Sequence, residues 1–148
     1  MTRPASMMEG LKGRQRVSRT ADERAQPRIR VLIADEHAAV RRGIAAFMLA
    51  FDDFELVGNA ASGQEVMDLC ACTHPDVVLM GMAMPDMTGA AAVRAICHTW
   101  PSTQVIALSS FQEEEQVQEV LSAGAVSCLL KNVAAEELAG AIRQAYAA

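Results

Sequence analysis

The chain has 148 residues, of which 51% are hydrophobic, and its formal net charge at pH 7 is −5. This length is typical of one domain with one buried core, and the apolar fraction excludes a chain that is disordered throughout. No apolar run approaches the roughly 20 residues that cross a bilayer, and no apolar segment follows the N-terminus as a secretory signal requires. We therefore expect a folded cytoplasmic protein that does not contact the membrane.

Residues 1–28 differ from the rest of the chain in charge and in pattern. They hold seven Lys and Arg residues against three Asp and Glu residues, so the remaining residues are strongly acidic. Because they lack apolar periodicity, they predict a disordered basic leader before a domain at 29–148. Such a tail could contact phosphates or a membrane surface, but a solvated extension is the commoner case. An acidic domain binds nucleic acid poorly, so we expect nucleic-acid binding only through a domain outside this chain.

Short apolar runs alternate with amphipathic segments from Ile29 onward. The pattern predicts five strands, at 29–34, 54–59, 76–81, 104–109 and 126–130. It predicts five helices, at 37–50, 63–73, 89–98, 113–122 and 134–147. Repeated strand–helix alternation indicates an α/β fold, with a five-stranded parallel sheet and helices on both faces. The strand at 54–59 alternates more than the others and is expected at an edge.

Two helix boundaries carry strong local signals. Ser62 stands three residues before Glu65, which is the spacing of a capping box at a helix N-terminus. Gly124 follows the fourth predicted helix and is expected to end it.

Polar residues and one glycine fall where the predicted strands end. Asp35 and Glu36 follow the first strand, and Lys131 follows the fifth. Gly81 ends the third strand and Ser109 ends the fourth. Parallel sheets carry their working sites at the carboxyl ends of the strands. Two acids and a lysine suit a divalent cation and a phosphoryl group, yet Gly81 offers no carboxylate to carry that group.

The chain resembles the receiver domain of bacterial two-component response regulators, and in particular the subfamily with a LuxR/NarL-type DNA-binding domain. The resemblance spans residues 29–147 and is carried by the segments VLIADEH (31–37), VRRG (40–43), PDVVLM (75–80), MP (84–85), Gly89, VIALSSF (105–111), AGA (123–125) and LLK (129–131). It implies a flavodoxin-like (βα)5 receiver fold. In that family an acidic pair and an acceptor aspartate hold Mg²⁺, and the aspartate takes a phosphoryl group from a histidine kinase or a small phosphodonor.

The resemblance also implies roles for individual residues. Asp35 and Glu36 would be the metal-side acids, Ser109 the hydroxyl that grips the phosphoryl oxygens, and Lys131 their cation. The acceptor position is Gly81, which has no nucleophile, and Glu36 is one methylene longer than the commoner Asp. The aromatic switch position of the fifth strand is Cys128. Because the acceptor aspartate and the aromatic switch residue are both missing, the resemblance suggests a phosphorylation switch that is no longer used.

Several other residues have ordinary structural interpretations. His37 is expected at a helix start as a surface or capping residue, and Asp86 in a loop pointing away from the pocket. Met80, Met82, Met84 and Met87 cross from strand to loop, so we expect them to pack rather than to bind a soft metal. Cys70, Cys72, Cys97 and Cys128 fit no disulfide or zinc framework and are expected to be small buried residues.

The leading hypothesis is a pseudo-receiver that is not an enzyme and works without aspartyl phosphorylation. It would act by protein–protein contact, as a homodimer or with a partner, with histidine kinase docking still possible. The interface would be helix 113–122, strand 126–130 and helix 134–147, or the first and last helices. No cofactor is expected, and Mg²⁺ would bind weakly through Asp35 and Glu36.

Two alternatives stay open. The first is a conventional phosphorylated transcription regulator inactivated by an Asp-to-Gly change at position 81. The second is an enzymatic or small-molecule-responsive domain that reuses the pocket; no nucleophile–base pair supports it.

Overall fold

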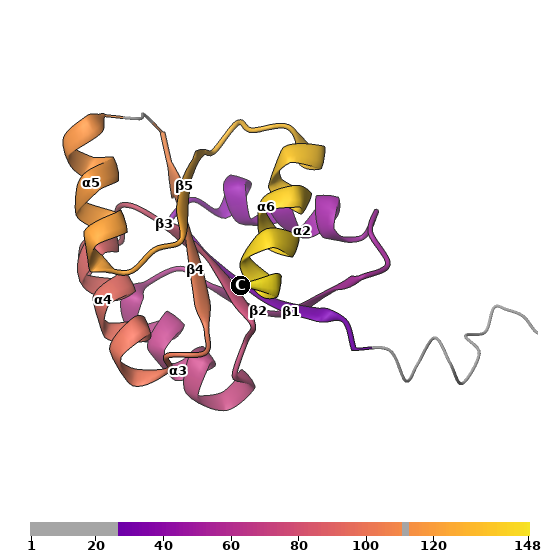
Figure 1. Ribbon diagram of the computed structural model, residues 1–148, viewed down its shortest axis with the longest axis horizontal. Coiled ribbons are helices and arrows are strands. Elements are labelled where there is room, and N and C mark those ends of the chain that lie inside the picture. The colour runs from indigo at the N-terminus through magenta and orange to yellow at the C-terminus, as the bar shows by residue number, and fades with distance from the viewer. Residues whose placement is uncertain (1–26, 111–112) are drawn as a thin grey trace, which may run out of the picture.

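The computed structural model describes residues 27–110 and 113–148, so the predicted leader lies outside the described residues except at positions 27 and 28. Its strands are β1 (Ile29–Ala34), β2 (Phe54–Ala60), β3 (Val77–Gly81), β4 (Gln104–Ser109) and β5 (Ser127–Leu130). Its helices are α2 (Ala38–Met48), α3 (Gly63–Thr73), α4 (Gly89–Thr99), α5 (Glu114–Ala123) and α6 (Ala135–Ala147). Strands and helices alternate along the described chain (Figure 1) and agree with the predicted segments within three residues at each end.

The five strands form one parallel sheet in the order β2-β1-β3-β4-β5. This order confirms the α/β fold with a parallel sheet, and it places the more alternating strand β2 at an edge as predicted. The central strand β3 is buried at all five positions, which accounts for its uninterrupted apolar sequence, since helices cover both faces.

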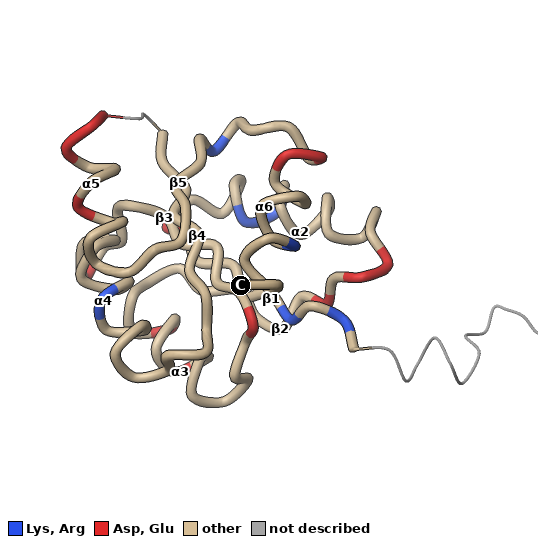
Figure 2. The backbone as a smooth tube through the Cα atoms, in the orientation of Figure 1, with Lys and Arg blue, Asp and Glu red and all other residues tan. Residues whose placement is uncertain are grey.

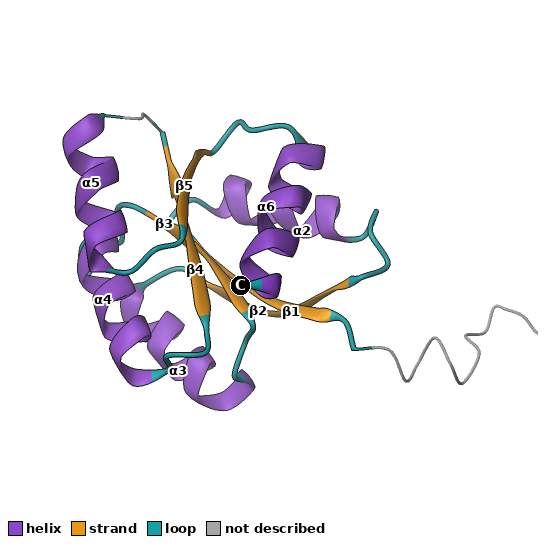
Figure 3. Ribbon diagram, viewed as in Figure 1, coloured by secondary structure: helices purple, strands orange, loops and turns teal. Residues whose placement is uncertain are grey.

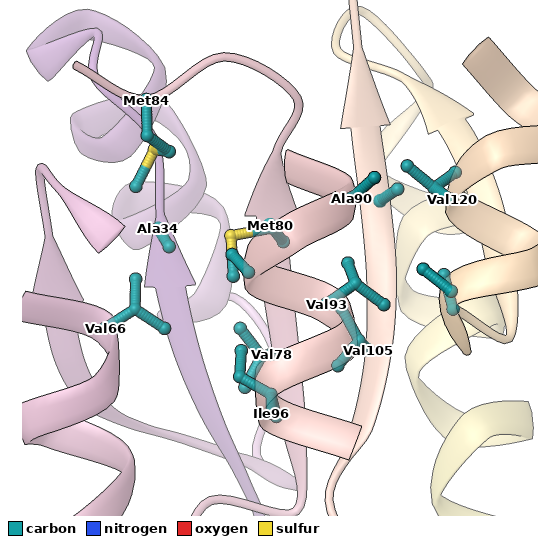
Figure 4. Packing of buried hydrophobic residues seen from close by; sticks show 14 of the residues in the cluster. Ala34, Val66, Val78, Met80, Met84, Ala90, Val93, Ile96, Val105 and Val120 are labelled. Atoms are coloured by element: carbon teal, nitrogen blue, oxygen red, sulfur yellow. The ribbon is translucent and has the colours of Figure 1, made fainter. Parts of the chain in front are cut away.

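Successive residues of the central strands point to opposite faces of the sheet. Leu32, Val78 and Met80 pack against α3, α4 and α5, and Figure 4 shows Val78 and Met80 facing Val66, Val93 and Ile96. Ile33 and Leu79 pack on the other side, against α2 and α6. The helices therefore lie as three on one face and two on the other (Figure 3).

The predicted helix boundaries are present with one change. The Ser62 hydroxyl accepts the Glu65 N–H at 3.2 Å, as a capping box requires. The Glu65 carboxylate, however, accepts the N–H of Ala61 rather than that of Ser62. Gly124 ends α5 with a φ of 125°, a backbone conformation that favours glycine. Acidic residues occupy the first turns of α5 and α6, visible as red segments in Figure 2, where the helix dipole stabilises them.

The sulfur-containing residues follow the predictions only in part. Met80 and Met84 are buried, and Met82 and Met87 pack partly buried against the same core. The four cysteines form no disulfide, but only Cys70 is buried. Cys72 is exposed, so the expectation of four buried cysteines is wrong, because Cys72 lies on the outer face of α3. Within the described residues, no helix is long and apolar enough to cross a membrane.

Candidate functional site

Asp35 follows directly on β1 and is fully buried at the carboxyl edge of the sheet. Its Oδ1 atom accepts the backbone N–H of His37 at 2.8 Å and lies 3.0 Å from His37 Nδ1. Its backbone carbonyl accepts a hydrogen bond from the Arg41 guanidinium at 2.6 Å. These contacts hold the carboxylate in one orientation, toward the end of β3.

Lys131 follows directly on β5, and its side chain contacts the other oxygen of the same carboxylate. Its Nζ lies 2.7 Å from Asp35 Oδ2, and its side chain is only 16% exposed. Oδ2 accepts no well-aligned hydrogen bond among the described residues, so the contact is an ion pair held by charge and proximity. The backbone N–H of Lys131 donates to the carbonyl of Ser109, which fixes the lysine to the end of β4.

Gly81 ends β3, in register with Leu108 of β4. A Cβ atom at position 81 would lie 2.5 Å from Asp35 Oδ2 and 3.1 Å from its Cγ. Real Cβ atoms do not make contacts this short, so the carboxylate and any side chain at position 81 compete for one space. Asp35 and Lys131 thus meet where the third strand carries no side chain.

Glu36 and His37 lie at the rim of this cluster. Both are exposed, and His37 Nε2 lies 3.9 Å from a Glu36 carboxylate oxygen. His37 is the N-cap residue of α2, but its side chain makes no capping hydrogen bond; its ring contacts Asp35 instead and lies 3.4 Å from Lys131 Nζ. The expected surface position of His37 is confirmed, and its contact with the buried carboxylate was not predicted.

A pocket of about 250 Å³ opens beside this cluster, toward α5. Its polar lining comes from His37, Thr88, Ser109, Ser110, Gln116, Glu119 and Lys131. Ser109 is buried at the end of β4. The structure therefore brings Asp35, Gly81, Ser109 and Lys131 to one edge of the sheet and leaves Glu36 at its rim.

Cys128 lies on β5, opposite Ala107 of β4, and packs partly buried against the core beneath α3, α4 and α5. Burial raises the pKa of its thiol. A thiol is much smaller than an aromatic ring, so at this position it fills less of the space between β5 and α5.

The donor set does not suit Mg²⁺. A magnesium ion requires near-octahedral oxygen ligands at short distances, whereas Oδ1 of Asp35 is bonded to His37 and Oδ2 is paired with Lys131. Gly81 supplies no ligand. Across the described ranges, no group of three or more His, Cys, Asp or Glu side chains could hold a metal.

Asp86 points away from the pocket, as expected, but it has a partner that was not predicted. Its carboxylate accepts the backbone N–H groups of Gly63 and Gln64 at 2.7 and 3.0 Å, at the N-terminus of α3. These two hydrogen bonds lower the pKa of Asp86. The β3–α4 loop is thereby tied to a helix that lies far from it in sequence.

The protein-family comparison matches residues 31–143 to the response regulator receiver domain. The transcriptional regulatory protein LiaR of Bacillus subtilis is 44% identical over 79% of this chain and 56% of its own length. The response regulator protein VraR of Staphylococcus aureus is 38% identical over 78% of this chain and 56% of its own length. The chain thus spans about half the length of the curated relatives it matches.

Solved structures give the same result. The signal receiver domain of the response regulator NarL from Mycobacterium tuberculosis superposes with a TM-score of 0.79 at 28% identity, over 82% of this chain and 98% of that one. The response regulator domain of CheB from Thermotoga maritima has a TM-score of 0.75 at 32% identity, with the same coverage.

Proposed function

Because the chain belongs to the response regulator receiver domain family, we propose that it is a receiver that signals without aspartyl phosphorylation. The single observation that carries the proposal is Gly81, which stands at the end of β3 with no group that could accept a phosphoryl group. The space that an acceptor side chain would need is taken by the Asp35 carboxylate. The domain therefore keeps the receiver fold and lacks the chemical step.

The proposed output is contact with another protein or with a second copy of the domain. Two surfaces that the family resemblance suggests carry apolar grooves. One lies between β5 and α6, where Val126, Leu129 and Ala141 are among the lining residues. The other lies between α2 and α6 and is lined in part by Gly43 and Phe47. DNA binding would belong to a domain outside this chain.

Phosphotransfer is the direct test of the proposal. The protein is incubated with Mg²⁺ and acetyl phosphate, and its intact mass is measured. We expect no added phosphoryl group, because Gly81 has no carboxylate. A stoichiometric acyl phosphate on any residue would overturn the proposal.

The variant Gly81→Asp tests whether the domain is disabled at one residue. The new side chain has to displace the Asp35 carboxylate, and the displaced carboxylate then lies beside a second one. We expect the variant to accept a phosphoryl group only if Ser109 and Lys131 can still hold it. Failure to do so would show that the pocket has diverged beyond a single substitution.

Sedimentation velocity on three proteins tests the proposed output. Val126→Glu places a charge in the β5–α6 groove, and Gly43→Glu places one in the α2–α6 groove, where a Cβ meets no atom within 4 Å. If the domain self-associates, one variant should be monomeric at concentrations at which the wild type is dimeric. The other then serves as its matched control and identifies the face that is not used.

A further inference from the structure

Each oxygen of the Asp35 carboxylate has a partner within the protein, although Oδ2 accepts no well-aligned hydrogen bond among the described residues. Oδ1 is held by the His37 backbone N–H, and Oδ2 faces the Lys131 ammonium at 2.7 Å. Asp35 has no solvent exposure, so a buried negative charge is balanced by one close positive charge. Removal of either partner from such a pair leaves an uncompensated charge in the interior.

The pair depends on the glycine of β3. Asp35 follows β1 and Lys131 follows β5, and strands β3 and β4 lie between β1 and β5 in the sheet. Position 81 has no Cβ, and an atom there would stand 2.5 Å from Oδ2, so a side chain at this position would have to displace the carboxylate from its place beside Lys131. The glycine thus leaves the Asp35 carboxylate in the position in which it pairs with the lysine.

We propose that the Lys131 ammonium is the resident cation of this site and that it excludes a divalent metal by pairing with Asp35. The inference rests on the proposed function, in which no phosphoryl group needs a metal. Lys131 is also bonded through its backbone to the end of β4. The ion pair therefore connects the ends of β1, β4 and β5 without phosphorylation and keeps the β5–α6 connection in one position.

Calorimetric titration with Mg²⁺ alone tests the proposal on three proteins. Wild type should show only millimolar affinity or weaker. Lys131→Gln removes the cation and frees Asp35 Oδ2 beside Glu36, so its Mg²⁺ affinity should rise by about tenfold or more, because a unit positive charge within a few ångströms of a divalent ion is strongly repulsive.

Arg41→Gln is the matched control. It removes the same charge from the same neighbourhood, since Arg41 bonds the Asp35 carbonyl, but it leaves the carboxylate paired with Lys131. Its Mg²⁺ affinity should rise much less than that of Lys131→Gln. Equal gains in the two variants would mean that general charge and not the ion pair excludes the metal, and the proposal would be wrong.

A second measurement needs no Lys131 variant and covers the case in which Lys131→Gln does not fold. The chain has two lysines, Lys12 and Lys131. In the wild type, acylation by an amine-reactive reagent should modify Lys131 far more slowly than in the urea-unfolded chain, and Asp35→Asn should accelerate it. Equal rates in the folded and unfolded wild type would overturn the proposal.

The outcomes separate this inference from the function on which it rests. If Lys131→Gln folds but gains no Mg²⁺ affinity and the wild type takes up no phosphoryl group, the resident-cation proposal is wrong and the phosphorylation-independent function stands. Phosphoryl uptake by the wild type would overturn the function itself.

Discussion

Gly81 is the residue that carries the proposed function, and its neighbours explain why glycine packs well at this position. Its backbone conformation does not demand glycine, because φ at position 81 lies outside the left-handed region. The requirement comes from Asp35, whose Oδ2 occupies the space of the absent Cβ. Glycine suits this position because a larger side chain would overlap the Asp35 carboxylate.

Gly81→Ala should lower the free energy of unfolding by about 1–3 kcal/mol, the usual cost of adding a methyl group where there is no room. The clash is with the end of a side chain, which would normally move aside at little cost. Asp35 cannot do so without losing its contacts with His37 or Lys131. Urea denaturation of both proteins measures the difference.

Gly43→Ala provides the control for this prediction. Gly43 lies inside α2, and a Cβ there meets no atom within 4 Å. Alanine is the better helix former, so this variant should gain about 0.5–1 kcal/mol of stability. If Gly81→Ala were also more stable than wild type, Asp35 would be free to move, and the close packing at position 81 would have no consequence.

The sequence allowed the members of the cluster to be named, but not the way in which they meet. Strand ends at Asp35, Gly81, Ser109 and Lys131 follow from apolar runs and from the rule that parallel strands end at one edge. The contact between Asp35 and Lys131 depends on side-chain direction and on an empty volume of a few ångströms. No local pattern in the sequence encodes either quantity.

At the scale of elements, the β3–α4 loop is held by a carboxylate from its own sequence. Asp86 accepts two backbone N–H groups at the start of α3, where the helix dipole also favours a negative charge. A hydrogen bond from the Gly89 N–H to the Met82 carbonyl closes the loop on itself. The loop that forms one wall of the pocket is thus anchored at both ends.

The stabilisation from Asp86 should depend on pH. Backbone hydrogen bonds from Gly63 and then Gln64 lower its pKa, so the folded protein binds the proton less well than the unfolded chain. The contribution is present above the unfolded pKa of about 4 and is lost as pH falls through the lower folded value. The wild type should therefore melt at a higher temperature than Asp86→Asn at pH 7. This difference in melting temperature should disappear as the pH falls below the folded pKa of Asp86.

Asp68→Asn is the matched control. Asp68 is an exposed carboxylate on α3, the helix whose N-terminus Asp86 contacts, but it accepts its hydrogen bond from the Gln64 side chain and not from the backbone. Its melting temperature should follow that of the wild type across the pH range. If the difference in melting temperature between wild type and Asp86→Asn stays constant from neutral to acidic pH, the charge of the Asp86 carboxylate does not contribute to stability.

Helix α6 is fastened to the edge of the sheet by Arg143. Its guanidinium makes two hydrogen bonds to the Asp53 carboxylate, at 2.7 and 3.1 Å, and lies over the rings of Phe51 and Phe54. The hydrogen bond from Arg143 is the main cause of the lowered pKa of Asp53. One side chain thus joins the last helix to the segment before β2.

Arg143→Lys should loosen this attachment although it keeps the charge, because lysine lacks the planar fork and stacks poorly on rings. Hydrogen exchange followed by mass spectrometry should show several-fold faster exchange in α6 and little change in α4. Arg94→Lys, an exposed position on α4 with no polar partner in the described part of the chain, is the control. Unchanged exchange in α6 would mean that its apolar face alone holds it.

The elements themselves could be predicted, whereas their attachments could not. Ser62 and Gly124 act over three or four residues, which a sequence pattern can capture. Asp86 acts on residues 22 and 23 positions away, and Arg143 on one 90 positions away. Such long-range pairs become visible only once the sheet order brings the segments together.

At the scale of the whole molecule, the described core begins at Ile29. Its backbone N–H donates to the Asp53 carbonyl, and its side chain is buried in the core on the α2 and α6 face. Among the residues that the structure describes, the members of the two core clusters begin at Ile29. The apolar runs that form these clusters are the strongest signal in the sequence, which is why the fold class could be predicted from them.

Deletion of residues 1–26 should accordingly leave the melting temperature unchanged. The main competing expectation is that the removed segment binds the rest of the chain by electrostatic attraction, since the segment is basic and the remainder of the chain is acidic. Such an attraction would be strong at low ionic strength and largely screened near 1 M salt, where the Debye length falls to about 3 Å. The melting temperatures of the chains 1–148 and 27–148, measured at low salt and at about 1 M salt, distinguish an independent leader from one that binds the domain electrostatically. We expect equal temperatures in each condition; a loss of several degrees on deletion that disappears at high salt would show that the leader binds the acidic domain.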